Sequence, residues 1–296
     1  MAAASVLLVD KPGGITSHGV VARARKALGT RKIGHAGTLD PMATGLLVLG
    51  VEGATRLLTY VVGLDKTYEA TIRLGVATDT DDAEGEITRR ADPSALTTDR
   101  VEAAIAPLRG RISQVPSSVS AIKVAGRRAY DLVRAGEDVE LKAREVEVTR
   151  FDVLDVRADA GDVVDVDVVV DCSSGTYIRA LARDLGAALG VGGHLTALRR
   201  TRIGPFDVQD AASLDDLAVA EGLAPADAAT AVLGRLEVTA DEARDLRHGK
   251  RLAGAATRLP SVPSAAVDPA GVLVGIVEKR GDDVKSAMNM PEEASG

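Results

Sequence analysis

One histidine and one carboxylate, His35 and Asp40, lie close together in the glycine-rich stretch 34–47 (GHAGTLDPMATGLL). A carboxylate that a stiff loop presents to a ligand can act as an oxygen nucleophile or as a general base. Pro41 biases Asp40 away from helix, and the apolar run 46–49 predicts a buried strand directly afterwards. We therefore expect a loop that presents Asp40 at the edge of a sheet. An Asp before a Pro is most often a turn residue that bonds its own backbone, and spacing alone favours that interpretation.

Hydrophobic periodicity predicts the elements on either side of this loop. Residues 5–9 form a short apolar run typical of a strand, and the run ends in the turn cluster 10–14 (DKPGG). A helix follows, which we expect to be capped by Thr16 or Ser17 and to end at Gly29. The loop with the carboxylate is therefore expected between a short helix and a buried strand.

Two later segments alternate between apolar and polar residues. Residues 68–74 alternate in this way, which predicts a half-buried strand. Residues 164–171 do the same and lead into a helix whose start Ser174 or Thr176 could cap. Residues 79–86 (DTDDAEGE) are acidic, but the glycine and the last glutamate are misplaced for an EF-hand loop. We expect an acidic turn there and no metal.

The composition is that of a globular protein. Its 296 residues are 46% hydrophobic and 27% charged, and no apolar run has the length needed to span a bilayer. A P-loop, a dinucleotide-binding fingerprint and a zinc-type Cys/His cluster are all missing from the sequence. Cys172 is the single cysteine, so it is expected to be a small buried residue in a reducing compartment. The start of the chain lacks the pattern of a signal peptide, and we expect a cytoplasmic protein without a membrane partner.

The net charge of −7 argues against a nucleic-acid partner, but the charges are segregated along the chain. The acids cluster at 79–86 and 152–171. The basic residues form three runs, which are Arg23, Arg25, Lys26, Arg31 and Lys32; Arg199, Arg200 and Arg202; and Lys123, Arg127, Arg128 and Arg134. A basic face and an acidic back would suit a phosphate-rich partner. Each run taken alone fits a solvated face equally well.

Residues 34–47 closely resemble the catalytic signature of the TruB family of tRNA pseudouridine synthases. The resemblance implies that Asp40 is the catalytic residue and that His35 fills the space vacated by a flipped base. Without it, His35 is interpreted as a hydrogen-bonded loop histidine. Lys11 lies in a segment similar to the family's D-K-P-x-G, which implies support of the catalytic loop or an RNA contact. On its own, Lys11 would be a surface charge in a turn.

Residues 66–70 resemble the family's K-x-Y-x-A motif, which implies that Tyr68 packs on the flipped uracil ring. Without the resemblance, Tyr68 would be an ordinary core aromatic. Residues 175–186 resemble G-x-Y-I-R-x-L-x-x-D-L-G, which implies that Arg179 lies against the catalytic carboxylate and that Tyr177 lines the same pocket. Taken alone, Arg179 would be a surface charge at the start of a helix. The resemblance also implies that Leu198 is the apolar residue near the base.

Residues 114–130 are similar to the family's P-P-x-x-S-A-x-K-x-x-G-x-R-A-Y segment, with Val115 in place of the first proline. They supply three candidate phosphate contacts, which are Lys123, Arg127 and Arg128. Such contacts position an RNA without reading its sequence. Residues 236–252 resemble, more weakly, the start of a PUA-type RNA-binding domain.

The fold implied by the resemblance is α+β. It comprises a catalytic domain at 1–232 around a mixed, largely antiparallel sheet, a small β-rich PUA-like domain at 233–288 and a disordered tail at 289–296. The implied function is that of an isomerase that converts the T-loop uridine of tRNA, at position 55, to pseudouridine by base flipping. The implied partner is the T-arm stem-loop, and we expect the protein to act as a monomer without a metal or other cofactor.

Two other functions fit some of the same features. A non-catalytic tRNA-binding or tRNA-folding factor could use the same scaffold, although the intact set of Asp40, Tyr68 and Arg179 speaks against it. A small-molecule lyase that uses Asp40 would suit the acidic net charge, but it leaves the basic runs without a purpose. The residues leave open whether Asp40 attacks C6 of the base, attacks C1′ of the ribose, or starts an elimination as a base.

Overall fold

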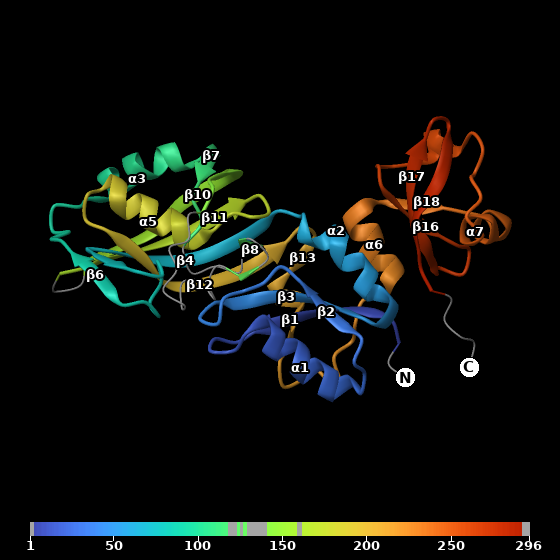
Figure 1. Ribbon diagram of the computed structural model, residues 1–296, viewed down its shortest axis with the longest axis horizontal. Coiled ribbons are helices and arrows are strands. Elements are labelled where there is room, and N and C mark those ends of the chain that lie inside the picture. The colour runs from blue at the N-terminus through green and yellow to red at the C-terminus, as the bar shows by residue number, and fades with distance from the viewer. Residues whose placement is uncertain (1–2, 118–122, 125–126, 129–140, 159–161, 292–296) are drawn as a thin grey trace. The chain divides into compact units, whose positions relative to one another are not determined.

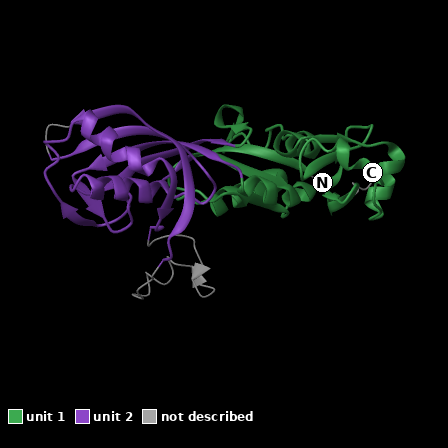
Figure 2. Cartoon of the chain, turned by 90° about the horizontal axis from the view of Figure 1, so that it is seen from above, with its two compact units in different colours: residues 1–41, 45–63, 204–296 green, residues 42–44, 64–203 purple. Residues whose placement is uncertain are grey.

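The computed structural model describes residues 3–117, 123–124, 127–128, 141–158 and 162–291. The chain divides into two compact units (Figure 2). Unit 1 comprises residues 1–41, 45–63 and 204–296, and unit 2 comprises residues 42–44 and 64–203. Among the helices in the described part of the chain, none is long and apolar enough to cross a membrane.

Unit 1 begins with four strands of a mixed sheet, and helix α1 packs on one side of them. The strands are β1 (Ser5–Lys11), β2 (Ile33–Ala36), β3 (Thr44–Val51) and β14 (Ala212–Ser213). Strand β3 pairs antiparallel with both β1 and β2, whereas β14 pairs parallel with β1. The predicted strands at 5–9 and 46–49 are confirmed.

Helix α1 spans Ser17–Leu28, as predicted. The Thr16 side chain accepts a hydrogen bond from the Gly19 N–H, and Gly29 ends the helix at φ 64°. The apolar face of the helix packs with Leu47 and Leu49 of β3 in one buried cluster. The helix is thereby fixed beside the strand that follows the Asp40 loop.

Further short elements complete this part of unit 1. They are η1 (Glu52–Leu57), α2 (Leu58–Val62), β13 (Phe206–Asp207), η3 (Val208–Asp210) and α6 (Pro225–Leu233). Pro225 starts α6, where a missing N–H costs nothing because the first helical N–H groups lack partners within the helix.

The C-terminal part of unit 1 has a sheet and a core of its own. The sheet consists of β15 (Arg235–Glu237), β16 (Ser264–Val267), β17 (Leu273–Arg280) and β18 (Asp283–Asn289), in that spatial order. Helix α7 (Ala240–Arg247) and η4 (Ala255–Arg258) accompany it, and a capping box of Thr239 and Glu242 starts α7. Leu246 and Val277 lie in a core made of residues from this part. The small β-rich C-terminal fold is confirmed.

The structure bears on the predicted start of the C-terminal tail, but not on the predicted domain boundary. Asn289, where we expected the tail to begin, pairs with Gly275 as the last residue of β18, and the Met290 N–H donates to the Val274 carbonyl at 2.9 Å. The sheet therefore extends to the predicted start of the tail. Residues 292–296 lie outside the described residues, and the boundary at 232–233 stays a prediction.

Unit 2 contains five neighbouring antiparallel strands of the mixed sheet. Their spatial order is β12 (Gly193–Ile203), β4 (Lys66–Leu74), β11 (Val164–Cys172), β10 (Arg144–Ala158) and β7 (Gly110–Gln114). Helices α3 (Thr98–Ile105) and α5 (Ile178–Ala188) lie over one face of the sheet (Figure 1). The strands predicted at 68–74 and 164–171 are confirmed, and so is the α+β class with a mixed, largely antiparallel sheet.

Two hairpins and a short helical turn complete unit 2. They are β5 (Val76–Thr78) with β6 (Ile87–Arg90), η2 (Ala106–Leu108), and β8 (Lys123–Val124) with β9 (Arg127–Arg128). The side chains of Lys123, Arg127 and Arg128 lie outside the described part of the structure, so these three predicted RNA contacts stay predictions.

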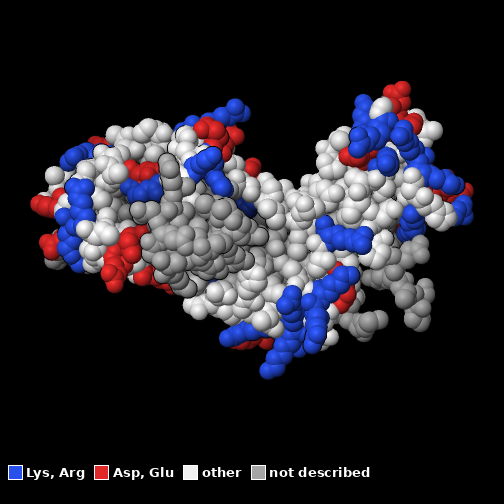
Figure 3. All heavy atoms as spheres, viewed as in Figure 1, with Lys and Arg blue, Asp and Glu red and all other residues white. Residues whose placement is uncertain are grey.

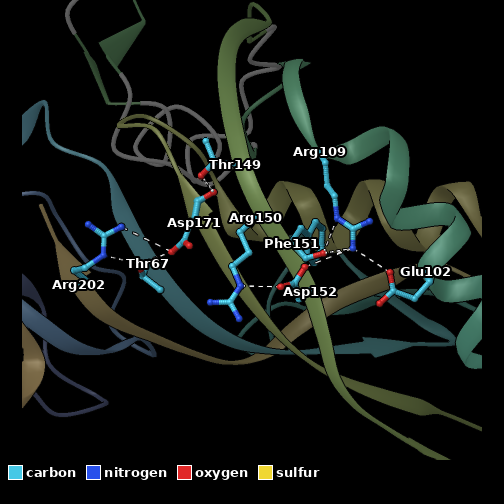
Figure 4. A network of polar contacts seen from close by, with 9 residues as sticks. All are labelled: Thr67, Glu102, Arg109, Thr149, Arg150, Phe151, Asp152, Asp171 and Arg202. Carbon is cyan, nitrogen blue, oxygen red and sulfur yellow. Dashed lines mark hydrogen bonds and ion pairs between the residues drawn. The ribbon is translucent and has the colours of Figure 1, made fainter.

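The other face of this sheet carries cross-strand polar pairs between β4 and β11. Arg73 Nη2 lies 2.7 Å from Asp165 Oδ2, and the Thr71 hydroxyl donates to Asp167 Oδ1 at 2.7 Å. In Figure 4, Asp171 of β11 points toward Thr67, and the Arg202 Nε–H donates to the Thr67 hydroxyl at 2.9 Å. Directly opposed residues of this kind stabilise strand pairing.

These pairs correct the expectation of a basic face and an acidic back. Arg202 of the second basic run lies 3.8 Å from Asp171 of the acidic cluster, and Arg200 is only 1% exposed. The run 199–202 is therefore not a solvated face. The sequence did not predict this contact, because the run 199–202 and the acidic cluster 152–171 are brought together only by the pairing of β12, β4 and β11.

Candidate active site

The loop that carries Asp40 is held on both sides by hydrogen bonds within unit 1. The Leu39 N–H donates to the Ser17 hydroxyl at 2.9 Å. The same hydroxyl donates to the Leu39 carbonyl oxygen at 3.1 Å. The Gly14 N–H donates to the Pro41 carbonyl at 2.8 Å. Leu39 is buried, whereas Asp40 is half-buried. The backbone around Asp40 is thus fixed, and the residue itself is partly exposed.

Lys11 is buried and forms hydrogen bonds with the backbone of the same loop. Its ammonium group donates to the carbonyls of Ile15 at 2.7 Å, Pro12 at 3.0 Å and Pro41 at 3.2 Å. The residue is fully buried, so the interpretation as a surface charge is wrong. A primary ammonium suits this position because its three N–H bonds can each reach a different carbonyl. The geometry favours loop support as the role of Lys11.

Replacing Lys11 with Met should lower the free energy of unfolding by about 1–3 kcal/mol, since carbonyls in the loop would be left without their buried donor. Urea unfolding of the two proteins measures this difference. The matched control is Lys32→Met, which changes an exposed lysine of the same unit and should have little effect. Equal stability of Lys11→Met and the wild type would show that the buried ammonium does not support the loop.

His35 lies in β2, directly before the Asp40 loop, and is half-buried. Its ring contacts the ring of His18 edge-on, with centroids 5.2 Å apart and planes at 84°. Its backbone pairs with Leu49 of β3. The predicted role of His35 at a flipped base stays a prediction.

In unit 2, strand register brings Tyr68 and Leu198 onto the same buried face. Tyr68 of β4 stands opposite Arg200 of β12, and Ala70 stands opposite Leu198. Because directly opposed residues of antiparallel strands point to the same side, Tyr68 and Leu198 are neighbours on the face that Ile72 also shares. Tyr68 and Leu198 are each 8% exposed. An aromatic ring and an aliphatic side chain together form an apolar surface that suits a flat base.

Tyr177 is the N-cap residue of α5, and its backbone is held by the side-chain amide of Gln114. The Tyr177 N–H donates to Gln114 Oε1 at 2.8 Å, and Gln114 Nε2 donates to the Tyr177 carbonyl at 3.1 Å. The two predicted caps were wrong, because no side chain caps α5 and the Thr176 hydroxyl donates to the Ser173 carbonyl instead. Gln114 lies 63 residues away in the sequence, and no local pattern indicated it.

Replacing Gln114 with Glu should keep the acceptor and remove the donor, which places a carboxylate oxygen against the Tyr177 carbonyl. We expect a loss of about 1–3 kcal/mol in the free energy of unfolding at pH 8. The folded state should raise the pKa of the new carboxyl, since protonation restores the donor. The loss should therefore shrink as the pH falls toward 5.

Urea unfolding at pH 8 and pH 5 measures this pH-dependent loss. Gln209→Glu, at an exposed glutamine, is the matched control and should behave like the wild type at both values. A Gln114→Glu protein with the same loss at both pH values would contradict the proposed donor role.

Arg179 is a buried anchor of α5 rather than the surface charge that its position alone suggests. Its Nη1 donates to the Thr80 carbonyl at 3.0 Å and lies 3.3 Å from Asp82 Oδ2, and both side chains of the ion pair are 5% exposed. One turn later, Arg183 Nη1 lies 3.3 Å from Asp81 Oδ2. Burial raises the pKa of Asp81, while the Arg183 guanidinium opposes that rise.

The acidic turn 79–86 is therefore the partner of α5. Within the turn, Asp79 Oδ1 accepts from the Glu86 N–H at 2.8 Å, and Asp82 Oδ1 accepts from the Glu84 N–H at 3.1 Å. Sequence reasoning treated these acids as a plain turn. The signal it missed was a pair of arginines four residues apart, which places two cations on one side of a helix.

Cys172 and Lys66 stand opposite each other in β11 and β4 and are both buried. Burial raises the pKa of the Cys172 thiol to about 11. Burial lowers the pKa of Lys66 to about 8, with a further contribution from the nearby Arg200. Cys172 is accordingly protonated at neutral pH and is the small buried residue that the sequence predicted. Within the described residues, no group of three or more His, Cys, Asp or Glu could hold a metal ion.

The predicted site residues thus fall into two groups. Asp40, Lys11 and His35 gather around one loop of unit 1. The other group belongs to unit 2 and consists of Tyr68, Tyr177, Arg179 and Leu198. The pairing of Arg179 with Asp40 that the resemblance implied stays a prediction.

Three family models match successive parts of the chain. Residues 25–178 match the N-terminal domain of the TruB family of pseudouridylate synthases. Residues 179–237 match the C-terminal domain of tRNA pseudouridylate synthase B, and residues 233–291 match the C-terminal domain of tRNA pseudouridine synthase II.

Curated relatives are similar to this chain over most of their length. A tRNA pseudouridine synthase B of Leifsonia xyli subsp. xyli (strain CTCB07) is 56% identical over 298 residues, which cover 99% of this chain and 98% of the relative. The protein of the same name from Mycobacterium avium (strain 104) is 59% identical over 257 residues, covering 86% and 83%. A solved structure of an H/ACA RNP bound to a substrate RNA containing 2′-deoxyuridine aligns with a TM-score of 0.71 at 26% identity, covering 98% of this chain and 86% of that one.

The fold, the loop around Asp40 and these likenesses together define a pseudouridine synthase, an isomerase that acts on RNA. Within that class, the chain belongs to the TruB family.

Proposed function

We propose that this chain converts the T-loop uridine at position 55 of tRNA into pseudouridine, with Asp40 as the group that starts the reaction. The observation that carries the proposal is the loop of Asp40, whose backbone is bonded on one side to Ser17 and on the other to Lys11 and Gly14, while Asp40 itself stays partly exposed. The relatives named as tRNA pseudouridine synthase B support tRNA as the substrate.

The reaction is an isomerisation in which atoms and electrons balance within the substrate. The bond between uracil N1 and ribose C1′ breaks, a bond between C5 and C1′ forms, C5 loses its proton, and N1 gains one. No donor group or redox partner is required. Because a stacked base is inaccessible, the uridine must first flip out of the RNA at a cost of about a few kcal/mol. Asp40 then attacks C6 or C1′, or removes a proton to start an elimination.

The remaining residues have supporting roles in this proposal. Tyr68 stacks on the uracil and takes part in removing the C5 proton, Leu198 extends the apolar surface, and Tyr177 lines the same pocket. Arg179 keeps Asp40 ionised and oriented by charge-assisted hydrogen bonds. His35 fills the space that the flipped base leaves. The RNA backbone is held by phosphate contacts from Lys123, Arg127 and Arg128, with the C-terminal β-rich fold as a further RNA-binding part. The enzyme acts as a monomer in the cytoplasm.

Tritium release from C5-labelled uridine tests the proposal. The protein should release a single equivalent of tritium from an unmodified tRNA transcript, because the C5 proton leaves once per converted uridine. The matched control is the same transcript with cytidine at position 55, which should release none. Release from the control would contradict the assigned position. Binding without release from either RNA would favour the non-catalytic tRNA-folding factor.

A further inference from the structure

The outward side of α1 and the loop behind it form a basic surface. Apolar residues cover the inner side of the helix, where Val20, Val21 and Ala24 are buried. The outer side and the following loop present exposed cations, which we call the α1 basic surface and which are Arg23, Lys26, Arg31 and Lys32. We propose that this surface binds phosphates of the RNA strand outside the target loop; the inference rests on the proposed function and names a second contact region for the same substrate.

The cations of the α1 basic surface are available to a ligand. None of their four side chains has a hydrogen bond or ion pair with a residue in the described ranges. The arginines of the sheet in unit 2 differ in this respect, since Arg73 and Arg157 form ion pairs with aspartates of β11. In Figure 3, Lys and Arg atoms gather over the position of α1. Exposed cations that form no ion pair with any described residue, in a chain of net charge −7, form a local site for a polyanion.

Two neighbouring side chains hold this region in place through hydrogen bonds to other groups than the four cations. Arg25 Nη2 donates to the Ile33 carbonyl at 3.0 Å, which ties the helix to β2. Glu52 brings a carboxylate close to this loop, where it accepts a hydrogen bond from the Thr30 hydroxyl. The loop that carries Arg31 and Lys32 is thereby anchored, while their own side chains point into solvent.

The helix that carries most of the α1 basic surface is tied at its start to the proposed active-site loop. Ser17, in the first turn of α1, bonds the backbone of Leu39 next to Asp40. His18 follows, and its ring contacts His35. The 12-residue helix extends about 18 Å at 1.5 Å per residue, and the cations lie in its second half and beyond. RNA whose target base lies at Asp40 can therefore place several phosphates of an adjoining segment along this helix.

Helix stability offers a different explanation for part of the surface. Cations in the last turn of a helix are favoured by its macrodipole, and Arg25 and Lys26 occupy that turn. This explanation does not extend to Arg31 and Lys32, which lie beyond Gly29 at the helix end. It also predicts a change in unfolding temperature and none in RNA affinity, so the two explanations can be separated.

The test compares two triple variants of the full chain for binding to an unmodified tRNA transcript between 0.1 and 1 M salt. The test variant carries Arg23→Gln, Lys26→Gln and Lys32→Gln. The control variant carries Arg90→Gln, Arg100→Gln and Arg111→Gln, which are exposed arginines of unit 2. Each variant changes the net charge from −7 to −10, since three positive charges are lost, so any effect of total charge is matched.

We expect the test variant to bind about 100-fold more weakly than the wild type at 0.1 M salt, with the gap closing toward 1 M. The slope of log K against log salt should become less negative by about two to three, because each lost phosphate contact removes roughly 0.7–0.9. The control variant should keep nearly the wild-type slope. The proposal is wrong if the test variant keeps the wild-type slope, or if the control loses as much.

Failure of the proposed function gives a different result. The wild type would then bind the transcript without releasing tritium, and the affinity comparison would still decide whether the α1 basic surface contacts RNA. Thermal unfolding of both variants completes the comparison. A lower unfolding temperature for the test variant with unchanged RNA affinity would assign the cations to helix stability and overturn the proposal.

Discussion

Replacing Asp40 with Asn should reduce pseudouridine formation by at least about 10⁴-fold, while RNA binding stays close to that of the wild type. The amide has nearly the size of the carboxylate but lacks the charge and the nucleophilic oxygen that the proposed reaction requires. Losses of this order are typical when a group that takes part directly in bond making is removed. The bonds that hold the loop come from the backbone of Leu39 and Pro41, so they should survive the substitution.

Tritium release under single-turnover conditions measures the chemical step, and filter binding measures the affinity for the same transcript. Asp215→Asn is the matched control, since Asp215 is an exposed carboxylate of the same unit. It should leave both measurements unchanged. Turnover by the Asp40→Asn protein near the wild-type rate would show that Asp40 does not take part in the reaction. A parallel loss of affinity would instead point to a disturbed loop.

Replacing Asp82 with Ala should lower the free energy of unfolding by about 3–5 kcal/mol, the range seen when one partner of a buried ion pair is removed. Asp82 and Arg179 are each only 5% exposed, so water cannot take over the lost interaction with the guanidinium. The substitution also removes the acceptor for the Thr80 hydroxyl at 2.6 Å and for the Glu84 N–H. The turn and the start of α5 should loosen together.

Urea unfolding followed by circular dichroism gives the stability of this variant. The control is Asp155→Ala. Asp155 forms an ion pair with Arg157, and the Asp155 side chain is 60% exposed. An exposed pair is screened by water, so this control should change stability little. An Asp82→Ala protein as stable as the Asp155→Ala protein would mean that the buried ion pair contributes nothing to holding α5.

Local chemistry in the sequence determined the elements around the candidate site. The caps at Thr16 and Gly29 and the apolar spacing between them define α1, and strict alternation defines β4. Such features depend on residues within one turn or one strand, so they can be read without a partner segment. The long resemblance around Asp40 likewise needs only contiguous residues.

Only the tertiary structure decided which charged side chains are buried and what they bind. Lys11 reaches the Pro41 carbonyl across 30 positions, and Arg179 meets Asp82 across 97. Arg200 is buried although its neighbours in sequence predict a solvated run. Sequence periodicity does not identify the partner of a charged residue, because the burial of that residue depends on strand register and on segments far away in the chain. The sequence by itself therefore indicated the candidate catalytic loop, while the contacts that hold this loop and anchor α5 required the fold.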